Sequence, residues 1–182
     1  HTALESRDGR VIAIEDSAAP IRDEQGRVMG AVMVFHDVSE KRALTQQLSW
    51  QASHDPLTGL VNRREFEQRL EALLEDARAT GRHHALLFLD LDQFKLVNDT
   101  AGHAAGDELL RQLPRALREH LRSQDLLARL GGDEFALLLQ DADLAAASRV
   151  AEKIRAAVEE YRFHWQGHPF QVGASIGVAL VE

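Results

Sequence analysis

The chain has 182 residues, 45% hydrophobic and 27% charged, with only 12 glycines and 4 prolines, a composition that excludes disordered and fibrous proteins. It contains no cysteine, which excludes disulfide scaffolds, thiolate metal sites and cysteine nucleophiles and fits a reducing, cytoplasmic setting. Its net charge of −8 argues against nucleic-acid binding, and no apolar run reaches the roughly 18–20 residues of a membrane span, so this segment is expected to contact neither nucleic acid nor membrane.

The N-terminal region has the pattern of a β-sheet. Strand-like runs occur at residues 11–14 and 28–35, on either side of a turn-rich stretch at 23–26, which predicts the end of a β-sheet domain at residues 1–38. Because the chain begins with His1 rather than Met and opens within a strand pattern, we expect it to be excised from a longer protein. Any membrane anchor of that protein would then lie outside this segment.

A linker helix is predicted at residues 39–54, with Ser39 as its N-cap. Leu44, Leu48 and Gln51 recur at nearly heptad spacing, although this seam is shorter than the about three or four heptads that establish a coiled coil. The segment is therefore expected to connect two domains.

A helix and a buried strand are predicted after Asp55. The residues that share the apolar face of this helix are Phe66, Leu70, Leu73, Leu74 and Ala77. Gly81 follows where a helix stop is expected, and the apolar run at 85–89 predicts a buried strand that ends in Asp90 and Asp92.

The next predicted helix contains a proline. Its apolar positions are Leu109, Leu110, Leu113, Leu117 and Leu121. Pro114 lies among them, and because proline lacks a backbone donor and clashes with the preceding turn, a kink or a break is expected there.

The C-terminal half completes an alternating pattern of strands and helices. Apolar runs at 126–130 and 135–139 flank Gly131 and Gly132, which predicts a hairpin with a Gly-Gly tip. An amphipathic helix, a short strand pair around Gly167 and a last strand at 172–181 follow. The order β-α-β-β-α-β predicts an α+β fold of the ferredoxin-like kind, an antiparallel sheet with helices on one side.

Four carboxylates are expected to converge if the two strands that carry them are neighbours. Asp90 and Asp92 end one strand, while Asp133 and Glu134 occupy the hairpin tip. Clustered carboxylates either share a proton or bind a hard cation such as Mg²⁺, and two such ions form the clamp used in phosphoryl and nucleotidyl transfer. The alternative for each acid alone is a solvated turn residue.

Five ordered motifs resemble those of the GGDEF diguanylate cyclases. They are DPLTGLVNRREF at 55–66, FLDLDQFKLVND at 88–99, GHAAGD at 102–107, GGDEF at 131–135 and SIGVA at 175–179. The resemblance implies a nucleotide-cyclase-like catalytic domain at residues 55–182 that lacks its final helix. It also implies that two GTP-loaded domains pair as a homodimer and condense GTP into cyclic di-GMP with release of pyrophosphate.

The resemblance implies a role for each acid of the cluster. Asp90 and the backbone carbonyl of Leu91 resemble metal ligands of the family, and Asp133 resembles the carboxylate that bridges two Mg²⁺ (or Mn²⁺) ions in each active site. Asp133 or Glu134 would also assist removal of the 3′-hydroxyl proton. Lys95 would meet the terminal phosphates, the alternative being a solvated lysine in a loop.

Three further positions resemble substrate contacts. Asn98 and Asp107 resemble the guanine readers, whose amide and carboxylate suit the acceptor and donor groups on the edge of that base. Asp107 precedes a leucine-rich run and is equally placed to cap a helix. His103 is expected to contact substrate or to make a structural turn bond.

Arg122 and Asp125 form an RxxD pair just upstream of the signature. The pair resembles the family's inhibitory product site, at which cyclic di-GMP binds, and arginine can engage a guanine edge or a phosphate with two parallel bonds. The alternative is an exposed ion pair at a helix end.

Residues 1–38 resemble the last strands of a PAS sensor domain. The sequence near the C-terminus resembles that of hybrid proteins in which an EAL phosphodiesterase follows. The alternative to catalysis is a silent module that binds GTP or cyclic di-GMP and controls such an output domain. Intact acids at Asp90, Asp133 and Glu134 favour catalysis. An RNA-binding domain of the same fold is disfavoured, because the acidic chain has only 5% aromatic residues.

Overall fold

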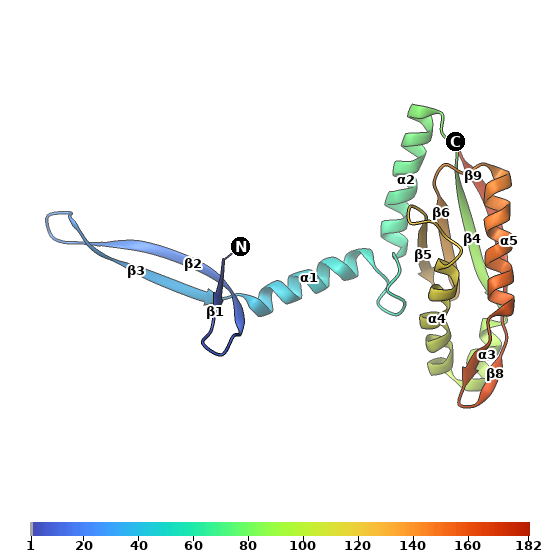
Figure 1. Ribbon diagram of the computed structural model, residues 1–182, viewed down its shortest axis with the longest axis horizontal. Coiled ribbons are helices and arrows are strands. Elements are labelled where there is room, and N and C mark those ends of the chain that lie inside the picture. The colour runs from blue at the N-terminus through green and yellow to red at the C-terminus, as the bar shows by residue number, and fades with distance from the viewer. Residues whose placement is uncertain (1) are drawn as a thin grey trace. The chain divides into compact units, whose positions relative to one another are not determined.

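The computed structural model describes residues 2–182, which form two compact units, His1–Trp50 and Gln51–Glu182. Residue 1 of the predicted sensor fragment lies outside the described residues. The first unit contains an antiparallel meander of β1 (Thr2–Glu5), β2 (Val11–Arg22) and β3 (Val28–Asp37) (Figure 1).

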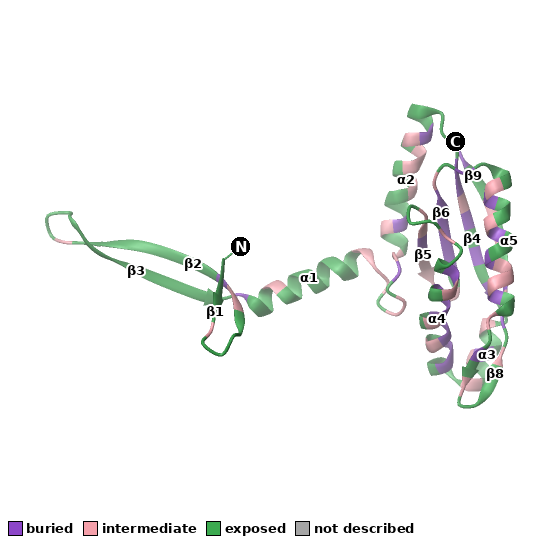
Figure 2. Cartoon of the chain, in the orientation of Figure 1, coloured by how far each residue is buried: buried purple, intermediate pink, exposed green. Residues whose placement is uncertain are grey.

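Strand β2 is much longer than the predicted run at 11–14, because it stays paired with β3 as far as Arg22. Most residues of this sheet are exposed (Figure 2), and its buried apolar residue is Ile14; Val38, which follows β3, is also buried.

The predicted linker helix forms as α1 (Ser39–Ser53), but the expected N-cap is wrong. Ser39 is already helical, and its hydroxyl oxygen accepts a hydrogen bond from the Ala13 backbone N–H at 3.1 Å. The carboxylate of Asp37 accepts from the Ser39 N–H at 2.9 Å and takes the capping role instead. Leu44 and Leu48 are exposed on α1.

The second unit alternates helices with the strands of a larger sheet. Its elements are α2 (Arg63–Thr80), β4 (His84–Asp92), α3 (Phe94–Ala101), α4 (His103–Arg118), β5 (Leu126–Gly131), β6 (Glu134–Leu139), α5 (Leu144–Glu160), β7 (Phe163–Trp165), β8 (His168–Phe170) and β9 (Gly173–Val181). Strands β5-β6-β4-β9 form one antiparallel sheet in that order, and β7 and β8 form a separate hairpin. The predicted ferredoxin-like order is confirmed.

The sheet is covered on both faces. Alternate β4 residues Leu87, Leu89 and Leu91 are buried in the main core with apolar residues of α3, α4 and α5 (Figure 2). On the opposite face, Phe66 of α2 packs with Ala136 and other residues of β5 and β6. The core helices lie on one side as predicted, whereas α2 adds a second layer that the sequence pattern did not assign.

Two predictions about the helices between β4 and β5 are corrected. The eight-residue helix α3 was not predicted. Helix α4 continues through Pro114, so the expected break does not occur, while the alternative of a kink there stays a prediction. Pro114 is itself buried, and so are Leu113 and Leu117 on either side, so core packing outweighs the lost backbone hydrogen bond. Leu121 lies beyond the end of α4 at Arg118.

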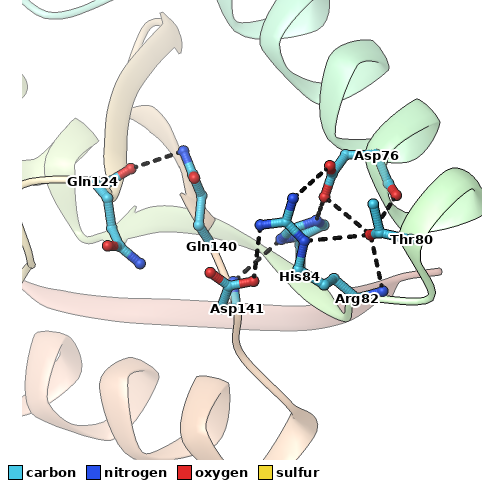
Figure 3. Close-up of polar contacts among 7 residues, drawn as sticks. All are labelled: Asp76, Thr80, Arg82, His84, Gln124, Gln140 and Asp141. Atoms are coloured by element: carbon cyan, nitrogen blue, oxygen red, sulfur yellow. Dashed lines mark hydrogen bonds and ion pairs between the residues drawn. The ribbon is translucent and has the colours of Figure 1, made fainter.

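A polar network fixes the end of the sheet at which β4 begins (Figure 3). His84, only 1% exposed, accepts the Asp141 backbone N–H at Nδ1, 3.2 Å, so in the neutral ring Nε2 donates to Asp76 Oδ2 at 3.0 Å. The side-chain amide of Gln140 donates to the Gln124 carbonyl at 3.2 Å. These bonds join α2, β4 and the turns around β5 and β6.

Within residues 2–182, no helix is both long enough and apolar enough to cross a membrane.

Candidate active site

The GGDEF hairpin is shaped by its two glycines. Gly131 has φ +147° and Gly132 has φ +52°, which are backbone conformations that L side chains rarely adopt. A Cβ atom at either position would meet no neighbour within 4 Å. Backbone conformation, not lack of space, therefore requires glycine here, and the resulting tight tip carries Asp133.

The two acid-bearing strands, β4 and β6, are neighbours, which was the condition for their acids to converge. Asp90 of β4 lies directly opposite Glu134 of β6 in the antiparallel register. Loss of solvation, followed by repulsion from Asp133, Asp92 and Glu134, raises the pKa of Asp90, although the residue as a whole is exposed. The four carboxylates therefore share one electrostatic environment.

The acid cluster has the oxygen donors that a hard cation prefers. In residues 2–182, however, no three His, Cys, Asp or Glu side chains are grouped closely enough to hold a metal ion. The Ser175 hydroxyl donates to Asp92 Oδ1 at 2.8 Å, and the side chain of Leu91 is buried in the core, 2% exposed. A metal role at Leu91 would use only its backbone carbonyl.

Arg129 and Asp55 brace the hairpin tip from within the domain. Arg129 donates to the Gly132 carbonyl from Nε at 3.0 Å and from Nη2 at 2.8 Å. Its Nη1 lies 3.0 and 3.1 Å from the two carboxylate oxygens of Asp55, and the two side chains are only 12% and 18% exposed. Arg129 thus links Asp55, near the start of the second unit, to Gly132 at the tip of the hairpin.

Asp55 is itself held in place by a turn. Its Oδ1 accepts the Thr58 backbone N–H at 2.8 Å and the Thr58 hydroxyl at 2.6 Å. Burial acts to raise the pKa of Asp55, but the Thr58 bonds and the Arg129 guanidinium outweigh it and hold that pKa below its usual range. Asp55 therefore stays ionised beside Arg129.

The predicted substrate contacts lie on α3 and α4. Lys95 is exposed and makes no ion pair in the described part of the chain, and His103 is exposed at the start of α4. Asp107 lies inside α4 after the N-cap Gly102, so the alternative that it caps a helix is wrong.

Asn98 packs against Gly106 of α4, a glycine whose role sequence reasoning missed. A Cβ atom on Gly106 would come within 2.1 Å of Asn98 Oδ1 and 3.0 Å of the Phe94 ring. Only glycine permits this contact between α3 and α4, next to Asp107. The signal was present in the GHAAGD motif, but its packing role depends on two helices meeting.

Arg122 and Asp125 form a turn rather than an ion pair. Asp125 Oδ2 accepts the Arg122 backbone N–H at 2.9 Å, and the Asp125 N–H donates to the Arg122 carbonyl at 3.1 Å. Within residues 2–182 the Arg122 guanidinium makes no ion pair, so the alternative of an exposed charge pair is wrong.

Two hollows of about 340 Å³ each flank this turn, and both are lined by Arg122 and Asp125. Arg118 adds a positive charge to one, and Arg149 and Lys153 add two to the other, which Glu119 also lines, so cations outnumber carboxylates in both. The exposed guanidinium of Arg122 therefore lies in a basic surface suited to an anionic ligand.

Comparisons with known proteins agree with this architecture. The family described as "Diguanylate cyclase, GGDEF domain" matches residues 52–182. Probable diguanylate cyclase DgcE of Escherichia coli K12 is 48% identical over 179 residues, which are 98% of this chain and 16% of DgcE. Cyclic di-GMP phosphodiesterase PdeB of Shewanella oneidensis is 39% identical over 167 residues, 92% of this chain and 19% of PdeB.

Among solved structures, the coiled coil and GGDEF domain of DgcB from Caulobacter crescentus, in complex with c-di-GMP, superposes with a TM-score of 0.71 at 28% identity. The match covers 80% of this chain and 78% of that one. The chain spans less than a fifth of the length of DgcE and PdeB. With its family match over most of its length, this chain belongs to the GGDEF diguanylate cyclase domain family.

Proposed function

We propose that the protein synthesises cyclic di-GMP from two molecules of GTP. The observation that carries this proposal is the register that sets Asp90 opposite Glu134, beside a glycine-shaped tip that presents Asp133. In each half-reaction a 3′-hydroxyl oxygen bonds to the α-phosphorus of the other nucleotide. The bond between the α- and β-phosphates breaks, and pyrophosphate leaves; two such steps close the ring.

No three acidic side chains among residues 2–182 are grouped closely enough to hold a metal ion by themselves, so divalent cations would need two carboxylates of the cluster together with a backbone carbonyl. Asp90, the Leu91 carbonyl and Asp133 would hold Mg²⁺ or Mn²⁺, because oxygen ligands and concentrated negative charge favour hard ions. Repulsion among the acids, visible in the raised pKa of Asp90, supports this assignment, because a bound cation would relieve it. When bound, such ions supply positive charge to the α-phosphate and the departing pyrophosphate.

The chain's own residues perform the remaining steps. Asp133 or Glu134 accepts the proton of the attacking 3′-hydroxyl, because each carboxylate lies at or beside the hairpin tip. Lys95, exposed at the start of α3, binds the terminal phosphates as a point charge. These roles require the 3′-hydroxyl of one nucleotide to lie in line with the α-phosphate of the other.

Guanine recognition is assigned to the junction of α3 and α4. Asn98 and Asp107 bind the acceptor and donor edge of the base, and the close approach at Gly106 fixes the amide of Asn98. His103, at the start of α4, contacts the same nucleotide. One domain binds one GTP, so the reaction requires a homodimer in which each domain supplies a 3′-hydroxyl to its partner.

Arg122 and Asp125 form a separate site for the product. The exposed Arg122 guanidinium and its basic neighbours suit the guanine edges and phosphates of cyclic di-GMP. Product bound there favours a separated arrangement of domains, and linkage requires that this arrangement bind the product more tightly. The result is feedback inhibition. The complex of DgcB with c-di-GMP supports product binding by a relative.

The N-terminal unit is proposed to be the end of a PAS-like sensor domain, and α1 its connection to the cyclase domain. The exposed three-stranded sheet and the polar helix that follows support this division. Signals received by the sensor would reach the cyclase domain through α1.

The decisive experiment is incubation of the natural full-length protein with GTP and Mg²⁺, followed by nucleotide analysis. We expect cyclic di-GMP and pyrophosphate, and no product after chelation of the metal. The second candidate, a silent regulatory module, is favoured by the resemblance to the phosphodiesterase PdeB. GTP binding without any product would support that module and overturn the cyclase assignment.

A further inference from the structure

Arg63 joins the two arms of the GGDEF hairpin from outside the sheet. It is the first residue of α2, and its Nε donates to the Leu130 carbonyl oxygen of β5 at 3.2 Å. Its Nη2 lies 3.3 Å from Oε2 of Glu134, the first residue of β6. A single guanidinium therefore spans the base of the tip that carries Asp133.

The same guanidinium borders the acid cluster. A hollow of about 220 Å³ on this face of the sheet is lined by Arg63, Asp90, Glu134 and Ser175, together with apolar residues. Arg63 is the only cation among the described residues that line it. It therefore supplies positive charge to Glu134, which lies opposite Asp90 in the sheet.

The exposure of this pair argues against a purely structural role. The side chains of Arg63 and Glu134 are each 55% exposed, and exposed ion pairs contribute little to stability. Arg129 is committed elsewhere, to Gly132 and Asp55, so it cannot hold Glu134. What Arg63 fixes is the direction of one carboxylate.

We infer that Arg63 is a positioning residue for the cyclase reaction, which keeps the Glu134 carboxylate and the base of the hairpin aligned for removal of the 3′-hydroxyl proton. The inference rests on the proposed function of Glu134. A general base must lie within hydrogen-bond reach of the proton it accepts, and a misplacement of about 1 Å can cost a hundredfold in rate. Arg63 acts through Glu134 and does not itself contact the substrate.

The kinetic test compares Arg63→Gln with Arg64→Gln in the natural full-length protein. Arg64 is the next residue of α2 and is exposed, with no ion pair in the described residues. The substitution Arg64→Gln therefore removes the same charge without breaking a contact to the hairpin. Arg63→Gln should lower kcat by about ten- to a hundredfold and leave the KM for GTP within about twofold. Arg64→Gln should change neither. A raised KM with unchanged kcat would mean that Arg63 binds substrate directly, and would overturn the inference.

A double-mutant cycle tests whether Arg63 acts through Glu134. In a Glu134→Gln background, Arg63→Gln should reduce the residual rate by less than about twofold, because the carboxylate it positions is gone. A loss as large as in the wild-type background would contradict the inference.

Amide hydrogen exchange provides a readout that is independent of turnover. Arg63→Gln should speed exchange at residues 130–134 by about tenfold, while exchange in the rest of the sheet and the thermal midpoint stay unchanged. Unchanged exchange at the hairpin would overturn the positioning role even if the protein is an active cyclase. Faster exchange in a protein without cyclase activity would instead reject the proposed function and retain the bracing of the hairpin.

Discussion

The two ends of β5 use the same pair of residue types in opposite ways. Before the strand, Asp125 binds the backbone of Arg122 and leaves the guanidinium exposed beside two hollows. Near its end, Arg129 is half-buried, pairs with Asp55 and donates to the carbonyl of Gly132. In both places an aspartate organises an arginine, but one arginine faces solvent and the other bonds mainly within the fold.

The difference shows what each end can do. An arginine with four side-chain hydrogen bonds inside the fold, like Arg129, can hold a backbone in place and keeps at most one of its five donors for a ligand. An arginine held only through its backbone, like Arg122, keeps all five side-chain donors for an anion. Hairpin and turn are thus suited to different tasks, precise placement of the acids at one and product capture at the other.

The sharpest test of the hairpin is Asp133→Asn, which keeps the shape of the side chain and removes its charge. Cyclic di-GMP synthesis should fall by at least about a thousandfold, since metal binding and proton removal both depend on that charge. The thermal midpoint should stay within about 2 °C, because Asp133 is only partly buried at the hairpin tip and its near-isosteric replacement keeps the shape of the side chain. The rate of synthesis is measured as turnover of GTP, and the thermal midpoint is taken from a melting curve. Asp99→Asn, an exposed aspartate of α3, is the matched control, and wild-type rates in the Asp133 variant would reject the assignment.

The brace between Asp55 and Arg129 should affect both stability and rate. Asp55→Asn keeps the acceptor for Thr58 but loses the ion pair, so the free energy of unfolding should fall by about 2 kcal/mol and kcat by about tenfold. Asp76→Asn is the control, because it breaks a pair with His84 and Arg82 at the other end of β4. It should lower stability without changing kcat. Urea unfolding and steady-state kinetics separate the two cases.

Lowering the pH should remove the difference in stability between wild type and Asp55→Asn. Because the pKa of Asp55 is lower in the folded protein than in the unfolded chain, its contribution is complete above the unfolded pKa of about 3.9 and is lost as pH falls through the folded value. The gap in unfolding free energy between wild type and Asp55→Asn should therefore be constant from about pH 7 to 5 and narrow below about 4. A gap that widens in acid would contradict the ion-pair account.

The other end of β5 is tested by Arg122→Ala. Affinity for cyclic di-GMP should fall by about ten- to a hundredfold, with loss of product inhibition, while kcat at low product stays unchanged. Arg115→Ala, an exposed arginine of α4, removes the same charge outside the hollows and serves as the control. Calorimetric titration with cyclic di-GMP measures affinity at the product site, and a parallel titration with GTP measures affinity at the active site. Undiminished affinity for cyclic di-GMP would leave Arg122 an ordinary surface residue.

Sequence reasoning succeeded where the determinants are local. The Gly-Gly tip, the apolar runs of β4 and β6 and the helix stop at Gly81 each follow from a few neighbouring residues, and all were predicted. The order of the strands then made Asp90 and Glu134 neighbours. The roles of the individual acids, Lys95 and the guanine readers stay predictions.

Sequence reasoning failed where a contact joins residues that are far apart along the chain. Arg129 bonds to Asp55 across 74 residues and Arg63 to Glu134 across 71, and no periodic pattern encodes such contacts. Gly106 resembles any helical glycine until α3 is packed against it. Pro114 was expected to break a helix because its propensity was weighed without the surrounding core.

The smallest expected effect separates the two roles available to Asp125. If its carboxylate serves the turn alone, Asp125→Asn should be nearly neutral, because the amide oxygen still accepts the Arg122 N–H, and Asp125→Ala should cost about 1 kcal/mol of unfolding free energy. If the carboxylate also binds the donor edge of guanine, Asp125→Asn should weaken cyclic di-GMP binding by about fivefold with no loss of stability. We expect the second pattern, since Asp125 lines both hollows together with Arg122. Melting curves and calorimetry on the two variants decide it. Unchanged affinity for cyclic di-GMP in Asp125→Asn would assign Asp125 to the turn, with the arginine alone left to recognise the product.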